Sequence, residues 1–422
     1  MAERSSEKPA KAEKAEKALK RERRDKDKAE NGGKRAKNGH ANGHNGHAMA
    51  SVATLDIEAA AATTRKAGHT SRASTINVEL LRHLSETPGV SGREERVRAL
   101  VIEQLTPLVD EISVDALGNV IAIKHGSSDR RVMLAAHMDE IGFMVRYIEE
   151  RGFLRIQPLG GFDARVLVAQ RVIVHTRSGE ALHGALTPAT KPIHLLGDEK
   201  PAVPKLEEFY VDLGLPGERV RELVSIGDSI TLDRTCELLG DTVMGKAMDD
   251  RSGLFTMIET LRQVGKHEAT IIAVATVQEE VGLRGATTAA FQVEPDVAIA
   301  LDTTLAVDTP GMPETESVTR MGDGVAIKVF DSSAIPNYRL VAHLRAVAER
   351  YDIPHQLEVL PRGGTDAGAM QRSRGGAAAI TLSIPSRYVH TVNEMVSAND
   401  LAAAAQLLAR YLEDAHTGDY RL

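Results

Sequence analysis

The sequence is poor in several residue types and contains no long apolar run. Its 422 residues include one cysteine, no tryptophan, seven phenylalanines and seven tyrosines. The single Cys236 excludes an intramolecular disulfide and a thiolate cluster for a metal, so we predict an ordinary packed thiol there. No apolar stretch approaches the roughly 18 residues that a membrane helix needs. The N-terminus also carries charges where a signal peptide would be apolar, and we therefore predict a cytoplasmic protein with no membrane partner.

Residues 1–72 differ in composition from the rest of the chain. Residues 1–48 hold 14 Lys and Arg against 8 Asp and Glu, so they carry +6, while the remainder of the −7 chain carries −13. Because these residues offer little to bury, 1–72 are predicted to be a disordered, basic, low-complexity tail, with a helix candidate near 54–64. The basic runs could contact nucleic acid, but a solvated tail is the simpler interpretation, and nucleic acid is not an expected partner. His40, His44 and His47 would hold a metal poorly without a folded frame.

From about residue 73, apolar strands alternate with amphipathic helices, which predicts an α/β fold with a mixed sheet. Two helices flank the break at Pro88 and Gly89, VDALGNVIAIKHG is typical of a hairpin, and RVMLAAHMDEIGFMVRYI of two further strands. Later strands are predicted for ATIIAVATVQ, DVAIALDTT and GAAAITLSIP, and later helices for RSGLFTMIETLRQVG, 338–351 and 399–412. Between 155 and 240, short β runs alternate with polar turns. We therefore predict an α/β domain of 73–154 and 241–422, interrupted by a small β-rich domain of 155–240.

The stretch TVQEEVGLRGA places two carboxylates, Glu279 and Glu280, directly after the predicted strand 270–278. Open α/β sheets position ligands and catalytic groups at such strand ends. Adjacent residues there point in different directions, so one carboxylate could bind a metal while the other moves a proton. Two unpartnered carboxylates would cost several kcal/mol, which implies a metal or an arginine beside them unless they are exposed.

Other strand ends and turns carry residues of the same chemistry. They are His137 and Asp139 after VMLAA, Asp249 and Asp250 in AMDDRSG, Asp302 in DVAIALDTT, and His390 in IPSRYVHT. Each alone could be a helix cap, an ion-pair partner or part of a solvated loop. The residues at i and i+2 of HMD share one face of an extended chain, so the carboxylate could orient the imidazole. The order HMD, MDD, QEE, LD, YVH is more specific than any of its members.

This order of motifs resembles the M42 family of metallo-aminopeptidases, the glutamyl and tetrahedral (TET) aminopeptidase group, whose members have often been labelled endoglucanases. The resemblance runs from about residue 76 to 413. It includes PGVSGRE, DALGNVIA, AAHMDEIGFMV, ARVLVAQRVIV, GKAMDDRSG, VQEEVGLRGA, GDGVAIKV, GGTDAGAM and IPSRYVHT. Residues 1–72 fall outside it. The segment GALTPATKPIHLLGDEKPAV matches the family only loosely, and Thr391 stands where serine is expected.

The resemblance implies a dinuclear metal site and assigns a role to each motif residue. One metal would be bound by His137 and Asp302, the other by Glu280 and His390, with Asp249 bridging them, Glu279 as the general base, and Asp139 holding His137. Asp249 is preferred to Asp250 as the bridge because it lies four residues before Gly253, and the family implies an unusual peptide geometry after it. Thr365 and Asp366 are expected near the site, although a glycine-rich turn is an equally simple interpretation of their motif.

The charges of this ligand set agree with a two-metal site. Two divalent ions bring +4 and three ligand carboxylates bring −3, and a net positive centre lowers the pKa of water toward neutrality. Mixed imidazole and carboxylate ligands suit zinc, and cobalt or manganese could substitute. The expected activity is removal of the N-terminal residue from peptide substrates. The resemblance also implies a homo-oligomer, commonly a dodecamer in a tetrahedral shell with inward-facing sites.

Two other functions remain open from the sequence, and the paired carboxylates also suggest a glycosidase. The same ligands could serve another two-metal hydrolase, such as an N-acyl amino acid or peptide deacylase, and sequence does not resolve the shape of the substrate pocket. A non-enzymatic scaffold with a working basic tail is disfavoured by the intact ligand set. A glycosidase would need paired carboxylates roughly 5–10 Å apart without metals.

Overall fold

The computed structural model describes residues 76–422 except residues 199 and 201. The predictions for the tail 1–72, for its three histidines and for a helix near 54–64 therefore lie outside the described residues. None of the helices in the described part of the chain is long and apolar enough to cross a membrane. Cys236 is buried with 3% of its surface exposed, as predicted for a packed thiol.

Eleven strands form a large mixed sheet, in the order β1-β2-β12-β3-β13-β16-β17-β11-β10, with β14 paired to β16 and to β15. Their bounds are β1 Glu111–Val114, β2 Val120–Lys124, β3 Arg131–His137, β10 Glu237–Leu239, β11 Thr242–Gly245, β12 Thr270–Thr276, β13 Val297–Leu305, β14 Val325–Phe330, β15 His355–Val359, β16 Ala378–Arg387 and β17 Glu394–Ser397. The central strands β12, β3, β13 and β16 are parallel. Their carboxyl ends therefore meet at one edge of the sheet.

Helices cover both faces of this sheet, which explains why its central strands are apolar on both sides. Their bounds are α2 Val78–Glu86, α3 Glu95–Leu105, α5 Met248–Gln263, α6 Arg284–Val293, α7 Tyr338–Arg350, α8 Asp366–Gln371 and α9 Ala398–Asp414. On one face, α2, α3, α5, α7 and α9 contribute to the larger core cluster. On the other, α6 and α8 bury alanine, methionine and valine side chains against alternate residues of β3, β12 and β13.

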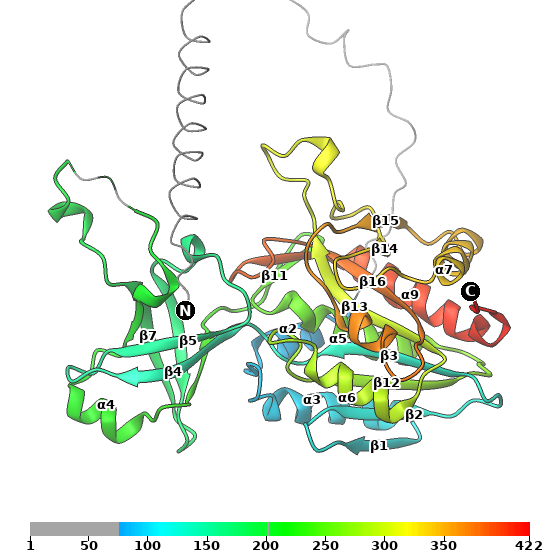
Figure 1. Cartoon of the computed structure of the whole chain (residues 1–422), viewed down its shortest axis with the longest axis horizontal. Coiled ribbons are helices and arrows are strands. Elements are labelled where there is room, and N and C mark those ends of the chain that lie inside the picture. Colours follow the sequence, from blue (N-terminus) through cyan, green and yellow to red (C-terminus); the bar gives the residue numbers. More distant parts are fainter. Residues whose placement is uncertain (1–75, 199, 201) are drawn as a thin grey trace, which may run out of the picture. The chain divides into compact units, whose positions relative to one another are not determined.

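Six strands close into a separate barrel in the order β4-β5-β8-β7-β6-β9 (Figure 1). Their bounds are β4 Gly142–Ile148, β5 Leu154–Leu159, β6 Gln170–His175, β7 Ala181–Pro188, β8 Phe209–Asp212 and β9 Ser229–Leu232, and the helix α4 spans Gly217–Leu223. The first barrel strand thus starts at Gly142, earlier than the predicted start at 155. The physical reason is that β4 is only partly buried: Phe143 and Val145 pack into the barrel core, while Arg146 and Tyr147 are exposed.

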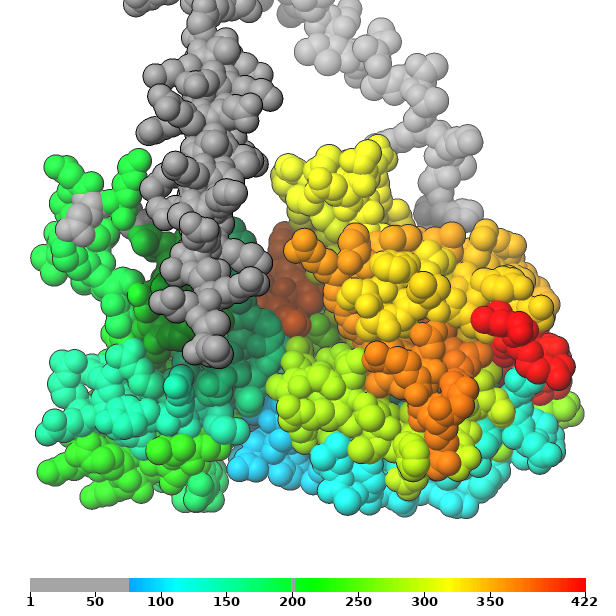
Figure 2. Space-filling model, viewed as in Figure 1, coloured from blue at the N-terminus to red at the C-terminus, as the bar shows by residue number. Residues whose placement is uncertain are grey.

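The predicted strands and helices of the α/β region are otherwise confirmed, and several short elements were not predicted. These are α6, α8, β10, β11, β14, β15 and β17. Among the connections, the one between β13 and β14 stands out from the surface in Figures 1 and 2 (yellow). It includes a short 3-10 helix at Glu314–Glu316 and exposes Met312.

Candidate active site and metal centre

The parallel strands bring the predicted site residues to one edge of the sheet. His137 ends β3 and is in register with Thr276, which ends β12, so Glu279 and Glu280 follow just beyond that edge. On the other side of β3, Ala135 is in register with Ala300 of β13, two residues before Asp302. His137 and Asp302 therefore project from neighbouring strands on the same face, because side chains alternate along a strand.

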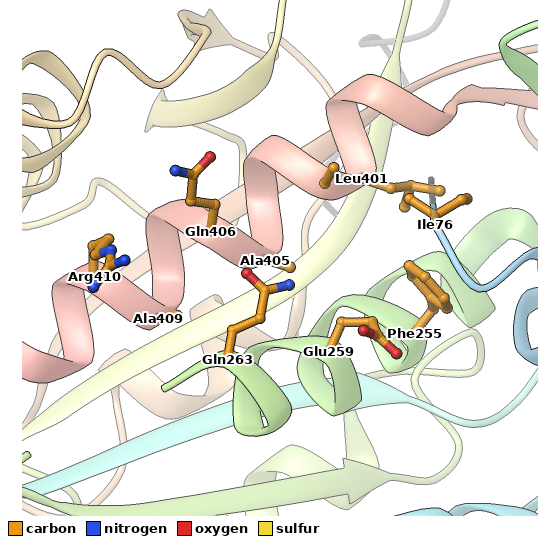
Figure 3. A pocket seen from close by; sticks show the side chains of 10 residues that line it. Ile76, Phe255, Glu259, Gln263, Leu401, Ala405, Gln406, Ala409 and Arg410 are labelled. Carbon is orange, nitrogen blue, oxygen red and sulfur yellow. The ribbon is translucent and has the colours of Figure 1, made fainter. Parts of the chain in front are cut away.

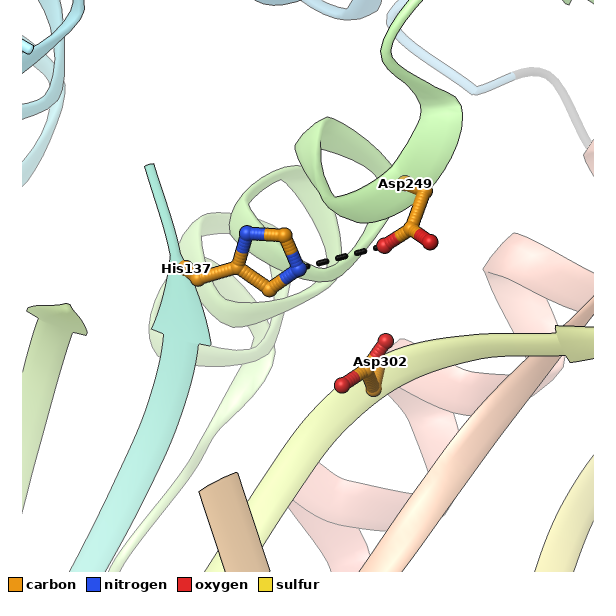
Figure 4. A group of neighbouring side chains, drawn as sticks. All are labelled: His137, Asp249 and Asp302. Atoms are coloured by element: carbon orange, nitrogen blue, oxygen red, sulfur yellow. Dashed lines mark hydrogen bonds and ion pairs between the residues drawn. The ribbon is translucent and has the colours of Figure 1, made fainter. Parts of the chain in front are cut away.

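Asp249 completes this group from the start of α5, where its backbone is not yet helical (φ −81°, ψ 104°). Figure 4 shows its carboxylate, the His137 imidazole and the Asp302 carboxylate pointing toward one another. His137 Nε2 lies 3.1 Å from Asp249 Oδ1. The peptide bond between Asp249 and Asp250 is cis, which matches the unusual geometry that the resemblance implies.

Within the described residues, two sets of three side chains could each hold a metal ion, with their ligand atoms within 4.8 Å of one another. The first set is His137, Asp249 and Asp302, and the second is Asp249, Glu280 and His390. Asp249 belongs to both, and its second oxygen, Oδ2, lies 3.4 Å from His390 Nε2. The two oxygens of one carboxylate thus face two different histidines, as a bridging ligand requires.

The chemistry of these two sets fits divalent cations. Two imidazoles and three carboxylates form a donor set typical of zinc and its first-row neighbours. Glu280 Oε1 is buried without a hydrogen-bond partner, although it lies 3.3 Å from His390 Nε2. A buried carboxylate oxygen without a partner carries a desolvation cost that a cation would offset.

Burial and crowding shift the protonation of these groups. Burial raises the pKa of Asp302 and Glu279 well above the ordinary value, and the charge of Asp249 adds to this for Asp302. Burial disfavours the charged form of His390, but the nearby carboxylates of Asp249 and Glu280 outweigh this effect and raise its pKa to about 12. The cluster therefore gathers more negative charge than its two histidines balance, which is the environment that favours a bound cation.

Glu279 and Glu280 occupy different positions, as predicted for adjacent strand-end residues. Glu280 belongs to one of the two metal sets, whereas Glu279 belongs to neither. The closest approach of Glu279 to His137 is 4.0 Å, between Oε2 and Nε2, and its side chain is 12% exposed. Glu279 also lines the adjoining pocket. It is therefore placed to act on a substrate or water beside the metal sets.

Asp139 has more partners than the sequence predicted. Its backbone oxygen lies 2.9 Å from His137 Nδ1, closer than its carboxylate, which lies 3.5 Å away. The fully buried carboxylate instead accepts hydrogen bonds from the Ser91 hydroxyl at 2.6 Å and from the main-chain N–H groups of Glu279 and Glu280 at 2.9 and 3.2 Å. Asp139 thus orients the histidine mainly through its backbone and holds the glutamate pair through its side chain.

Four successive main-chain N–H groups after β12 are held by buried side chains. Asn119 Oδ1 accepts from Val277 N at 3.0 Å, Glu94 Oε1 from Gln278 N at 3.2 Å, and Asp139 from the next two. Gln278 has a positive φ of 54°, a strained conformation for a residue other than glycine. Sequence reasoning assigned no role to Asn119 or Glu94, although both lie within motifs that carry the resemblance. Their partners are distant in sequence, so no local pattern identifies them.

Asp250 and Asp366 are close to the site but outside both metal sets. Asp250 is buried, and its carboxylate accepts from His137 N at 3.1 Å and from Gly253 N at 2.9 Å. Asp366, at the start of α8, accepts from the Thr276 hydroxyl at 2.6 Å. These two acids therefore brace the ends of β3 and β12, and the expectation that Asp366 lies near the site is met.

A pocket of about 530 Å³ opens beside the two metal sets. Its walls include Asp249, Glu279, Glu280, Asp302 and His390, together with Leu283, Leu305, Leu360, Val389 and Arg362. A different depression of about 280 Å³ lies between α5 and α9, where Ala402, Ala405 and Ala409 leave space (Figure 3). That depression contains no member of the metal sets. The first pocket therefore combines the candidate chemistry with room for a substrate.

Comparison with known proteins agrees with this geometry. The family model for M42 glutamyl aminopeptidase matches residues 118–407. The chain belongs to the M42 peptidase family. A putative aminopeptidase of Acetivibrio thermocellus is 42% identical over 331 residues, covering 78% of this chain and 96% of that protein. This M42 protein is therefore a peptide-bond hydrolase, which favours the predicted enzyme over the scaffold and the glycosidase.

Solved structures of the family share the fold. An aminopeptidase from the archaeon Desulfurococcus kamchatkensis superposes with a TM-score of 0.77 at 40% identity, covering 80% of this chain and 94% of that one. The TET1 peptidase of Pyrococcus horikoshii, which can assemble into a tetrahedron or a large octahedral shell, has a TM-score of 0.71 at 34% identity. The superposition covers 79% of this chain and 98% of the TET1 chain. The mixed sheet with a small closed barrel is thus the M42 fold.

Proposed function

We propose that this M42 protein is a two-metal aminopeptidase that removes the N-terminal residue of peptides. The observation that carries the proposal is the position of Asp249, whose two carboxylate oxygens lie near His137 in one metal set and near His390 in the other. His137 and Asp302 complete the first set, and Glu280 and His390 complete the second. The metals are two divalent cations, with zinc as the expected ion and cobalt or manganese as substitutes.

When bound, the cations would polarise the scissile carbonyl and lower the pKa of water toward neutrality. Glu279 is the general base: it takes the proton of the attacking water and passes it to the leaving amine. A base for this task must take a proton from water, and burial raises the pKa of Glu279 in the direction that makes it a stronger base. Asp139 supports the reaction by fixing the main chain of Glu279.

The free amino group of the substrate distinguishes an aminopeptidase from other two-metal hydrolases. Glu279 and Asp302 both line the pocket and provide carboxylate acceptors for an ammonium group. An acetylated amine has no positive charge and fewer donors, so these acceptors would be desolvated without a partner. At about 1–3 kcal/mol for each lost charged hydrogen bond, the loss in turnover should exceed about a hundredfold.

The test compares short peptides with free and acetylated N-termini on the metal-loaded protein and on protein treated with a chelator. Sequential release of single residues from the free peptides, lost on chelation, is the expected result. Cleavage of acetylated peptides at comparable rates, or cuts in their interior, would favour a deacylase or an endopeptidase instead. Peptide turnover that survives chelation would contradict the two-metal mechanism.

We also propose that the protein forms a homo-oligomer of about twelve subunits in a closed shell. The proposal is supported by the assembly of its relative, the TET1 peptidase of Pyrococcus horikoshii, into a tetrahedron or a larger shell. Light scattering should give roughly twelve times the 45.5 kDa of one chain. A monomer at micromolar concentration would contradict it.

A further inference from the structure

Glu394 is a buried glutamate whose side chain holds the main chain of two candidate metal ligands. It is 1% exposed and begins β17, opposite Gly245 of β11. Its Oε2 accepts a hydrogen bond from Asp249 N at 3.0 Å, and its Oε1 accepts from His390 N at 2.6 Å. In the described part of the chain, no other side chain accepts hydrogen bonds from the main-chain N–H groups of two members of the metal sets.

Both of those ligands come from irregular backbone. Asp249 precedes the regular part of α5, and His390 lies in the connection between β16 and β17 with a φ of 63°. A residue other than glycine rarely adopts such a φ unless other contacts hold it there. Since neither the helix nor the sheet fixes these two residues, the Glu394 carboxylate is the direct link that sets their separation.

Buried carboxylates also accept main-chain hydrogen bonds at the neighbouring site residues. Asp250 accepts from His137 N, and Asp139 accepts from Glu279 N and Glu280 N. Asp250 also accepts from Gly253 N, and Asp139 also accepts from the Ser91 hydroxyl, so these acids too join separate segments. Among these acids, Glu394 alone bonds the main chain of two members of the metal sets, and its partners Asp249 and His390 occur together only in the set of Asp249, Glu280 and His390.

We propose that Glu394 is a positioning residue that sets the spacing of Asp249 and His390, and so the affinity for the metal held by Asp249, Glu280 and His390. The proposal rests on the two-metal function proposed above. The other set, His137, Asp249 and Asp302, shares only Asp249 with Glu394. Disturbing Glu394 therefore weakens one metal more than the other.

The test is Glu394→Gln in the full chain. A glutamine has one acceptor oxygen, and its NH₂ group would face the second main-chain N–H, so one of the two bonds is lost. The matched control is Asp400→Asn. Asp400 is also a buried carboxylate with two main-chain bonds, but they hold Gly322 and Gly324 at 2.7 and 2.9 Å. Both substitutions replace a carboxyl group by an amide of the same shape and remove one such bond, and only the first acts on a metal set.

The measurement is titration of chelator-stripped protein with Zn²⁺ against a chromophoric competitor, together with the melting temperature of the stripped protein. The parent and Asp400→Asn should bind two equivalents with the same affinities. Glu394→Gln should weaken one equivalent by about 10- to 100-fold and the other by much less. A purely structural role would instead lower the melting temperature of the stripped protein without this split.

Two results would overturn the proposal: unchanged affinities in Glu394→Gln, or an equal loss of both equivalents. If Glu394→Gln does not fold, Glu394→Asp replaces it, because the shorter carboxylate keeps its charge but cannot keep both contacts, and the same split is expected. A parent that binds fewer than two equivalents would contradict the two-metal function itself. The titration of the parent protein shows that outcome before any variant is compared.

Discussion

Exchanging Glu279 and Glu280 for glutamine, one at a time, separates proton transfer from metal binding. Glu279→Gln keeps the shape of the side chain, and the main-chain bond from residue 279 to Asp139 does not depend on the side chain that is changed. Because Glu279 belongs to neither metal set, both metals should stay. The lost general base should lower kcat by about 10²–10⁴-fold, or about 2.7–5.4 kcal/mol of barrier.

Glu280→Gln should behave differently, because Glu280 Oε1 lies in the set with Asp249 and His390. An uncharged amide is a weaker metal ligand than a carboxylate, so this variant should lose metal as well as activity. The assay is the number of metal ions per chain by elemental analysis, alongside kcat for a free dipeptide. A suitable control is Glu222→Gln, an exposed residue of α4 paired with Arg219, which should change neither quantity.

The reasoning would be refuted by equal metal loss in the two site variants, since that would make Glu279 a ligand too. Metal loss in Glu279→Gln with full occupancy in Glu280→Gln would reverse the two roles. Near-parental kcat in metal-loaded Glu279→Gln would require another base.

Three further predictions concern residues 1–72, the metals and the dependence of stability on pH. Deleting residues 1–72, which lie outside the resemblance, should leave turnover and melting nearly unchanged; a large drop in either would mean that they contribute to the folded enzyme. Removing the metals should abolish peptidase activity and lower the melting temperature, because ligands that bind only the folded state stabilise it; re-addition of Zn²⁺ should restore both. The pH prediction concerns Asp308, whose two oxygens each lie 2.7 Å from Arg387 and whose pKa this pairing lowers. A lowered carboxyl pKa stabilises the fold above the ordinary range of aspartate and loses this effect as the pH falls through the lowered pKa, so Asp308→Asn should cost about 1 kcal/mol at pH 7 and progressively less as the pH falls below about 4. A constant difference in urea unfolding across that range would contradict it.

The parts of the fold that could be predicted from the sequence are those with continuous apolar runs. Strands β3, β12, β13 and β16 are buried on both faces, so each appears as a mainly apolar run with a His, Asp or Glu near or just beyond its carboxyl end. The strand β14 was missed because Lys328 interrupts its apolar pattern. That lysine is fully buried and pairs with Glu358 of β15 at 2.9 Å. A charge cancelled by a partner thirty residues away has no signature in a local window.

The start of the barrel was placed too late for a related reason. The strands β3 and β4 follow each other closely and both are predicted as strands, yet β3 is buried over its last six residues whereas β4 ends in exposed or half-buried residues. Partial burial of this kind is typical of a strand with one face toward solvent. The run of Phe143, Met144 and Val145 does not alternate with polar residues, so the sequence contains little sign that β4 belongs to the barrel.

The site residues divide in the same way between those that sequence can find and those that it cannot. Ligand candidates such as His137 and Asp302 follow apolar strands, so their chemistry and their position are both visible in the sequence. Glu94, Asn119 and Glu394 act through main-chain N–H groups of other segments, and a main-chain N–H is the same at every residue but proline. Nothing in the sequence around residue 390 marks residue 394 as its partner.

This division also separates what holds the fold from what holds the site. The apolar faces of β3, β12 and β13 are packed by helices on both sides, and that packing fixes the register that brings His137 and Asp302 together. Asp249, Glu280 and His390 lie in irregular backbone. Buried carboxylates, and not the apolar core, hold the main chain of these residues. The carboxylates have little apolar surface, so their loss removes few of the contacts that stabilise the sheet. Substitutions among them should therefore affect metal affinity and turnover before they affect folding, and substitutions in the strands should do the reverse.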